Sequence, residues 1–167
     1  MTPPQKSVVL ADTMAIKAAH DLRCWNALRN THQLHTVQMC IHEVTCTSKR
    51  GYRLLTRMPA DLEKEITVAT VTKKMRSDLD FRMGLRADVD KGERDLLAYA
   101  LTLRGAWWLC GPDNGTVRAL QVLKLFDHMV SLEAIATAAG HSAAMPSKHF
   151  TERWLADHRT QILFEET

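Results

Sequence analysis

The sequence has no apolar run of the ~18 to 20 residues that a membrane-spanning helix needs. The polar segment 1–6 carries two prolines and is followed by only a short apolar run, so we expect no signal peptide and no membrane partner. Aromatic residues make up only 6% of the chain, but hydrophobic residues reach 46%. These proportions predict a globular protein with a mainly aliphatic core.

Motifs of several enzyme classes are also missing. The chain has no P-loop, no GxGxxG dinucleotide fingerprint and no GxSxG nucleophile elbow. A haloacid-dehalogenase-like phosphatase would need a second aspartate two residues after Asp12, where this chain has Met14. The cysteines form no CxxC pair, which argues against a zinc site and indicates reduced thiols in the cytoplasm. They are Cys24, Cys40, Cys46 and Cys110.

The net charge of +3 is too small to indicate a nucleic-acid-binding protein by itself. The positive charges are nevertheless clustered, once around Tyr52 with no acid among them and once near the middle of the chain. Each cluster is either a solvated helix face or a surface for phosphate groups. The first consists of Lys49, Arg50, Arg53 and Arg57, and the second of Lys73, Lys74 and Arg76.

Short apolar or β-branched runs alternate with stretches of helical periodicity. We expect strands at 7–11, 35–41, 66–71, 107–110 and 129–132. Helices are expected at 13–30 with a break, 72–83 with Thr72 as N-cap, 90–103, 116–126 and from 147 or 151 to 163. This order predicts an α/β fold with three α/β/α layers and a central, mostly parallel sheet. We expect one domain over 1–167, with its core at about 7–132 and a C-terminal helical extension at about 147–165.

Acidic residues follow several of the expected strands. Asp12 comes directly after the first strand, Glu43 lies just beyond the second at the expected start of a helix, and Asp113 follows the run at 107–110. Ligands of open parallel sheets bind beyond the carboxyl ends of the strands. The three acids are therefore expected to converge, although a cap on the following helix is the alternative role for Asp12 and Asp113.

A fourth acid, Glu93, stands at the start of the helix expected at 90–103. At ~100° per residue the apolar stripe of this helix is centred close to Glu93, whereas Asp95 falls near 200° from it. We therefore expect Glu93 to face the cleft and Asp95 to be a solvated charge. The alternative for Glu93 is a first-turn acid favoured by the helix dipole. Four acids crowded into one crevice would repel one another unless divalent cations lay between them.

These residues resemble the motifs of the PIN-domain nucleases over about 7–132. The family's strand ending in Asp-Thr is matched by 8–13, and its glutamate after the second strand by Glu43 in IHEV. Its Gly-Glu helix start resembles 92–101, and its strand followed by Thr-Asp-Asp corresponds to 109–114. In the last motif Gly111 and Pro112 replace the polar residues before Asp113, so we expect weaker metal binding there.

The resemblance implies a ribonuclease that hydrolyses RNA phosphodiester bonds with Mg²⁺ or Mn²⁺ as cofactor. It implies that the same four side chains are both catalytic and metal-binding, namely Asp12, Glu43, Glu93 and Asp113. We expect the first basic cluster to bind RNA through Lys49, Arg50, Arg53 and Arg57. The family includes toxins paired with an antitoxin, housekeeping RNA-processing enzymes and dimers. The alternative function is a non-catalytic PIN scaffold that binds RNA or protein.

Overall fold

Four short parallel strands form the central sheet, in the order β3-β2-β1-β4. Val9 at the middle of the sheet pairs with Leu34 on one side and Trp108 on the other. Further out, Thr36 of the second strand pairs with Val68 of the third. The strands are β1 (Val8–Ala11), β2 (Gln33–Val37), β3 (Thr67–Ala69) and β4 (Trp107–Cys110).

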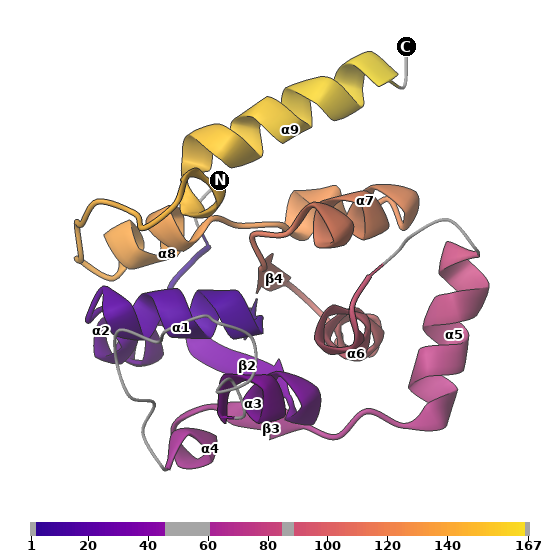
Figure 1. Cartoon of the computed structure of the whole chain (residues 1–167), viewed down its shortest axis with the longest axis horizontal. Helices are drawn as coiled ribbons and strands as arrows, with labels where there is room; N and C mark the ends of the chain where they lie inside the picture. The colour runs from indigo at the N-terminus through magenta and orange to yellow at the C-terminus, as the bar shows by residue number, and fades with distance from the viewer. Residues whose placement is uncertain (1–2, 46–60, 85–88, 166–167) are drawn as a thin grey trace.

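Helices connect and cover the strands in this computed structural model, which describes residues 3–45, 61–84 and 89–165 (Figure 1). The helices of the first half are α1 (Thr13–Asp21), α2 (Trp25–Thr31), α3 (Gln38–Thr45), α4 (Leu62–Glu65) and α5 (Lys73–Met83). Those of the second half are α6 (Lys91–Ala100), α7 (Asn114–Val122), α8 (Leu132–Ala138) and α9 (Glu152–Glu165). Two 3₁₀ turns, η2 (Phe126–His128) and η3 (Lys148–Phe150), complete the described elements.

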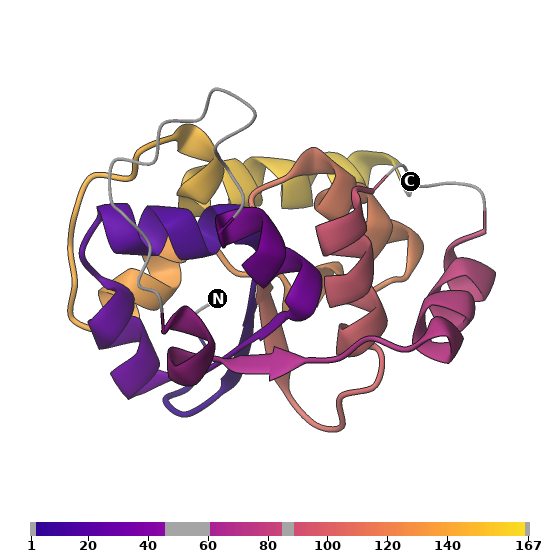
Figure 2. The ribbon, with the colours of Figure 1, turned by 60° about the horizontal axis from the view of Figure 1, so that its bottom comes forward.

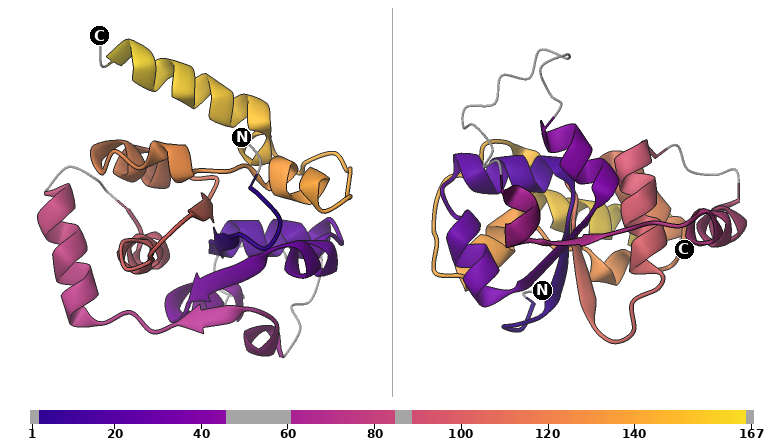
Figure 3. Two further views of the ribbon diagram at one scale, coloured as in Figure 1. Left: turned by 180° about the vertical axis from the view of Figure 1, so that it is seen from behind. Right: turned by 90° about the horizontal axis from the view of Figure 1, so that it is seen from below.

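Successive residues of β1 point to opposite faces of the sheet and enter two separate cores. Val9 packs in a core with Ile16 of α1 and Ile135 of α8. Leu10 packs in the other core, which contains Leu97 of α6 and also takes in α5, α7 and α9. Figure 3 shows α1 and α2 on one side of the strands and α5 and α6 on the other. The predicted three-layer α/β/α class is therefore confirmed.

Side chains just before several helices cap them by accepting backbone N–H groups. Asp12 caps α1, Asp90 caps α6, Asp113 caps α7 and Ser131 caps α8. Thr72 caps α5 as predicted, accepting a 3.2 Å hydrogen bond from the Met75 amide. Figure 2 shows a short connection that leads from β3 into this helix. An acid at a strand end thus has a structural role even before any chemistry.

The expected helix at 13–30 is broken as predicted. Its two parts, α1 and α2, are separated by 22–24, where Arg23 has a positive φ of 59°. A non-glycine residue in this conformation interrupts helical hydrogen bonding and redirects the chain.

Two expected strands are corrected. The strand expected at 35–41 begins earlier and ends at Val37, and α3 begins at once with Gln38. The run that looked like a strand buries Cys40, Ile41 and Val44 at helical spacing. The expected last strand at 129–132 is reduced to a single parallel bridge between Met129 and Leu109, after which α8 begins.

The described cysteines, Cys24, Cys40 and Cys110, are buried free thiols. Burial raises the pKa of Cys24 to about 11 and that of Cys40 to about 12, so these thiols stay protonated and weakly reactive. Cys46 lies outside the described residues. Among the described helices, none combines the length and the apolar character that crossing a membrane requires.

Candidate functional site

The carboxyl ends of β1 and β4 meet where the chain changes direction across the sheet. From β1 the chain adds β2 and β3 on one side, and β4 then pairs with the other side of β1. Asp12 follows β1 directly, and its amide continues the pairing with a 3.2 Å bond to the Cys110 carbonyl. Its side chain is 5% exposed and accepts a 2.6 Å bond from the Ala15 amide. Asp12 is therefore fixed at the point where open parallel sheets bind ligands.

Glu43 reaches the same place from α3. It lies in the second half of this helix, so the expectation that it stands at a helix start is wrong. The Thr13 hydroxyl donates a 2.6 Å hydrogen bond to Glu43 Oε2. On the other side, a methyl group built on Gly92 would lie only 2.8 Å from the same oxygen. Glu43 thus occupies a narrow space between the starts of α1 and α6, and only glycine at 92 leaves room for it.

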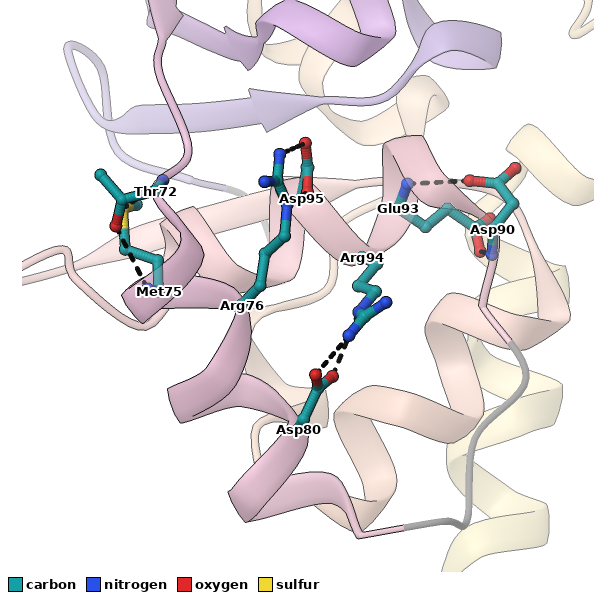
Figure 4. A network of polar contacts seen from close by, with 8 residues as sticks. All are labelled: Thr72, Met75, Arg76, Asp80, Asp90, Glu93, Arg94 and Asp95. Atoms are coloured by element: carbon teal, nitrogen blue, oxygen red, sulfur yellow. Dashed lines mark hydrogen bonds and ion pairs between the residues drawn. The ribbon is translucent and has the colours of Figure 1, made fainter.

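Glu93 is buried at the first turn of α6, with 8% of its surface exposed. Its amide donates a 2.9 Å hydrogen bond to Asp90 Oδ1, and its own carboxylate accepts a longer bond of 3.4 Å from the Asp90 amide. Figure 4 shows these two side chains turned toward each other. This reciprocal capping pair brings a further carboxylate, that of Asp90, into the group.

Asp113 follows β4 after Gly111 and Pro112 and caps α7, accepting a 2.5 Å bond from the Gly115 amide. Unlike Asp12 and Glu93, it is exposed to solvent. Gly111 lies against the buried acid, since a methyl group built on it would stand 3.4 Å from Asp12 Oδ2. The same methyl group would meet the Leu109 side chain more tightly, at 3.0 Å, so a larger residue at 111 is resisted by Leu109 rather than by Asp12.

The electrostatics of the two buried acids show that the carboxylates lie near one another. Burial, together with the charges of Asp90, Asp113 and Glu43, raises the pKa of Asp12 to about 7, against the lowering effect of the Ala15 amide bond. Burial likewise raises the pKa of Glu93 to about 8, helped by the charges of Asp113, Asp90 and Asp12. All four predicted site acids therefore lie close enough to interact, together with Asp90.

One buried cation accompanies these acids in the described part of the chain. Lys17 is 8% exposed, and burial lowers the pKa of its amine. The charges of Glu43 and Asp12 oppose this shift, which places the amine near both carboxylates. Lys17 stands one helical turn after Thr13 on α1, so the helix that Asp12 caps also carries the balancing charge.

Asp95 does not have the solvated position that we expected. It is 6% exposed and binds Arg76 of α5 through two hydrogen bonds of 2.5 and 2.7 Å. Figure 4 shows this pair apart from the Glu93 and Asp90 pair, with the Arg94 and Asp80 ion pair between α6 and α5. The angular separation of Glu93 and Asp95 therefore holds, but the outer position is covered by a neighbouring helix.

The structure describes only one of the two basic clusters. The residues predicted to bind RNA lie outside the described residues, namely Lys49, Arg50, Arg53 and Arg57. In the second cluster Lys73 and Lys74 are exposed, whereas Arg76 is held by Asp95. The second cluster is therefore partly a structural ion pair.

The site contains residues that the sequence analysis left out. Asp90 could have been found from its spacing, because an acid three residues before Glu93 is the signature of a capping box. Lys17 carries no comparable signal, since a lysine in an amphipathic helix is normally solvated. Its burial depends on α3 packing against α1, which only the tertiary structure reveals.

The arrangement offers several carboxylate oxygens, those of Asp12 and Glu93 on buried side chains, with few positive charges to balance them. Hard divalent cations such as Mg²⁺ and Mn²⁺ prefer oxygen donors of this kind. Within the described ranges, no three acidic, histidine or cysteine side chains already stand as a ready-made metal cage. The donor set fits such cations when water completes their coordination, as is usual for Mg²⁺.

No family model matches the chain, and no curated protein matches its sequence. Function is therefore inferred from the residues of the site and their surroundings.

Proposed function

We propose that the protein is a ribonuclease of the PIN type that depends on a divalent metal ion. The observation that carries this proposal is the meeting of carboxylates from separate segments at the carboxyl edge of the sheet. Asp12 and Asp113 come from the ends of β1 and β4, and Glu43 and Glu93 come from α3 and α6. Helix capping alone does not require carboxylates from separate segments to lie close together, where they repel one another.

The unfavourable free energy of burying several carboxylates near one another supports the binding of a divalent cation. Burying a carboxylate without a partner is unfavourable, and like charges nearby add to that cost. Both effects act on Asp12 and Glu93, whose pKa values are raised. Lys17 balances only part of the negative charge. Mg²⁺ or Mn²⁺ held by these carboxylates would compensate the rest, with Asp12 as the most central ligand and the exposed Asp113 on the solvent side.

Asp12, Glu43, Glu93 and Asp113 would hold the divalent cations, which would supply stabilisation of negative charge on the oxygens of an in-line displacement at phosphorus. Other residues of the chain fix the positions of these carboxylates. Asp12 is fixed by the Ala15 amide and Glu43 by the Thr13 hydroxyl. Asp113, which is exposed, is placed to meet the substrate from the solvent side. Because cations supply the electrophilic assistance, no side-chain nucleophile is required.

The second candidate is a PIN-like scaffold that binds RNA or protein without cutting it. The observation that favours it is the altered motif after β4, where Gly111 and Pro112 replace the polar residues before Asp113 and Asp113 itself is exposed. An exposed carboxylate contributes less to metal affinity than a preorganised one. The two candidates therefore differ in whether metal binding leads to cleavage.

We assign RNA as the substrate and the cytoplasm as the location. A protein partner, either an antitoxin or a second copy of the chain, belongs to the same proposal. The proposed RNA contacts of Lys49, Arg50, Arg53 and Arg57 would act through phosphate groups, so binding should weaken steeply with salt.

Incubation of the purified protein with mixed cellular RNA tests the proposal. We expect the protein to degrade the RNA when millimolar Mn²⁺ or Mg²⁺ is present, and we expect an excess of chelator to prevent this. Binding of RNA without any metal-dependent cleavage would instead establish the scaffold. A control preparation of Asp12→Asn, purified in the same way, separates the activity of this protein from that of a contaminant.

A further inference from the structure

A recess opens beside the candidate site, next to Asp113. It has a volume of about 310 Å³ and lies between the start of α7 and the segment formed by η3 and α9. Asn114, which follows the site residue Asp113, forms part of its wall. Its volume is at the lower end of the range for small-molecule sites. The site acids leave this recess unexplained.

Aromatic rings form one side of the recess. The rings of His149 and Trp154 are stacked, with centroids 5.2 Å apart and planes at 22°. The ring of His158 meets Trp154 edge-on at 4.4 Å and 78°. All three residues line the recess and are only half-buried. The rings give the recess an aromatic wall made partly of ring faces and partly of ring edges, and both can contact a flat aromatic ligand.

The other side chains of the recess are polar and exposed. Asn114 and Gln161 carry amides that both donate and accept hydrogen bonds, and Asp157 accepts them. Lys148 adds a positive charge to the rim. Rings beside mixed hydrogen-bonding groups and one cation match the chemistry of a nucleotide, which has a flat base with donors and acceptors and an anionic phosphate.

The ring surface is attached to the backbone of the candidate site. His149 Nδ1 lies 3.3 Å from the carbonyl oxygen of Pro112, the residue before Asp113. The Trp154 amide donates a 3.2 Å hydrogen bond to the Thr151 hydroxyl, which fixes the start of α9. A ligand stacked on these rings is therefore held at a set position relative to the carboxylates.

We propose that this recess binds one nucleobase of single-stranded RNA next to the nucleotide whose phosphate lies at the carboxylates. The proposal rests on the proposed function for its choice of RNA. Bases that stack on aromatic side chains bind with little dependence on sequence. The recess therefore positions the strand, and its polar rim adds a preference among bases through Asn114 and Gln161.

Binding to a short, fluorescently labelled single-stranded RNA tests the recess by anisotropy, in low salt with chelator present so that no metal-dependent step intervenes. Trp154→Leu removes the ring but keeps an apolar side chain, and Trp154→Phe keeps a smaller ring. We expect Trp154→Leu to weaken binding about 5- to 150-fold, the effect of losing one stacked base. Trp154→Phe should retain most of the affinity, and Thr160→Ala, elsewhere on α9, should change nothing.

A second oligonucleotide with abasic positions repeats the measurement on the wild-type protein. Loss of the bases should weaken binding by a similar factor, and Trp154→Leu should then cause no further loss. If circular dichroism shows that Trp154→Leu does not fold, the proposal is tested by the affinities of the wild type for the normal and the abasic oligonucleotide. Equal affinity of the wild type for both oligonucleotides overturns the proposal.

The result separates this proposal from the proposed function. Metal-dependent cleavage with no effect at Trp154 and no preference for bases would leave a ribonuclease without a base-binding recess. Base-dependent binding at Trp154 without cleavage would support the recess and identify the protein as an RNA-binding scaffold.

Discussion

The Thr13 hydroxyl donates a 2.6 Å hydrogen bond to Glu43 Oε2 across 30 positions of sequence. Thr13 directly follows Asp12, so this one bond ties the start of α1 to α3 at the centre of the acidic group. Hydrogen bonds to a charged acceptor are stronger than neutral ones and fix its orientation. At the proposed metal site, a threonine after Asp12 would therefore orient Glu43 as a ligand.

Thr13→Val should loosen Glu43 without changing the shape of the side chain much. We expect the affinity for Mn²⁺, measured by calorimetry, to fall about 10- to 100-fold, as for other residues that orient metal ligands. Thr13→Ser keeps the hydroxyl and should stay close to the wild type. Equal affinities of the valine and serine variants would show that the hydrogen bond does not orient a ligand.

Gly92→Ala should weaken metal binding while leaving the stability of the fold almost unchanged. Alanine favours a helix over glycine by up to about 1 kcal/mol, so the fold should not be weakened much. The added methyl group would stand 2.8 Å from Glu43 Oε2 and must displace this half-buried carboxylate. We expect roughly tenfold weaker Mn²⁺ binding with little change in Tm.

A double-mutant cycle supplies the control for Gly92→Ala. In a Glu43→Ala background the methyl group has no carboxylate to displace, so the same substitution should leave metal affinity unchanged. An undiminished effect in that background would mean that Gly92 acts through something other than Glu43.

Glu93 and Asp95 lie two residues apart on α6 and should respond oppositely to neutralisation. Asp95→Asn breaks the paired hydrogen bonds with Arg76 and should cost about 1 to 3 kcal/mol, or about 2 to 12 °C in Tm. Its cleavage rate per folded molecule should be unchanged. Glu93→Gln should abolish most metal-dependent cleavage and raise Tm above pH 8, because it removes a repelled, buried charge. A loss of cleavage in both variants, each still folded, would contradict this division.

The raised pKa values of Asp12 and Glu93 predict how stability depends on pH when metal is absent. The folded state holds these protons more tightly than the unfolded state, so stability should fall as pH rises from about 4 through the folded-state pKa values of about 7 and 8. A loss of only about 1.4 kcal/mol lowers Tm by about 3 to 6 °C in a chain of this size.

Thermal unfolding in chelator between pH 5.5 and 8.5 measures this dependence. Asp12→Asn should flatten the curve, and Mn²⁺ should raise Tm most at the alkaline end, where the carboxylates are charged. A Tm that rises with pH over this range in chelator would show that the acids are not held under repulsion.

Much of the sheet could be predicted because its strands are short apolar runs with distinct ends. The run before Asp12 became β1, and the run at 107–110 became β4 with the predicted bounds. The end of β2 could not be fixed, because the apolar residues after Val37 suit a strand or a buried helix equally. The segment is helical because Ile41 and Val44 both pack into the core that contains Ile16 of α1.

Asp12, Glu43, Glu93 and Asp113 could be named from the sequence, but Asp90 was not named and the partners of the acids could not be predicted. Periodicity places Glu93 and Asp95 on different sides of α6, yet it cannot show that Arg76 arrives from α5 to cover Asp95. Likewise, nothing local predicts that Lys17 is buried near Glu43 and Asp12. These features depend on contacts between elements that are distant in sequence, and each was therefore missed.

The most direct test of the account is the single-turnover rate of RNA cleavage as a function of Mn²⁺ concentration, for the wild type and for Asp12→Asn. Asp12→Asn keeps the shape of the side chain and removes one ligand charge at the centre of the group. We predict that wild-type cleavage rises with Mn²⁺ in the millimolar range, disappears with chelator and falls by orders of magnitude in Asp12→Asn. Cleavage that is independent of metal, or equal in the two proteins, would contradict the proposed role of the carboxylates.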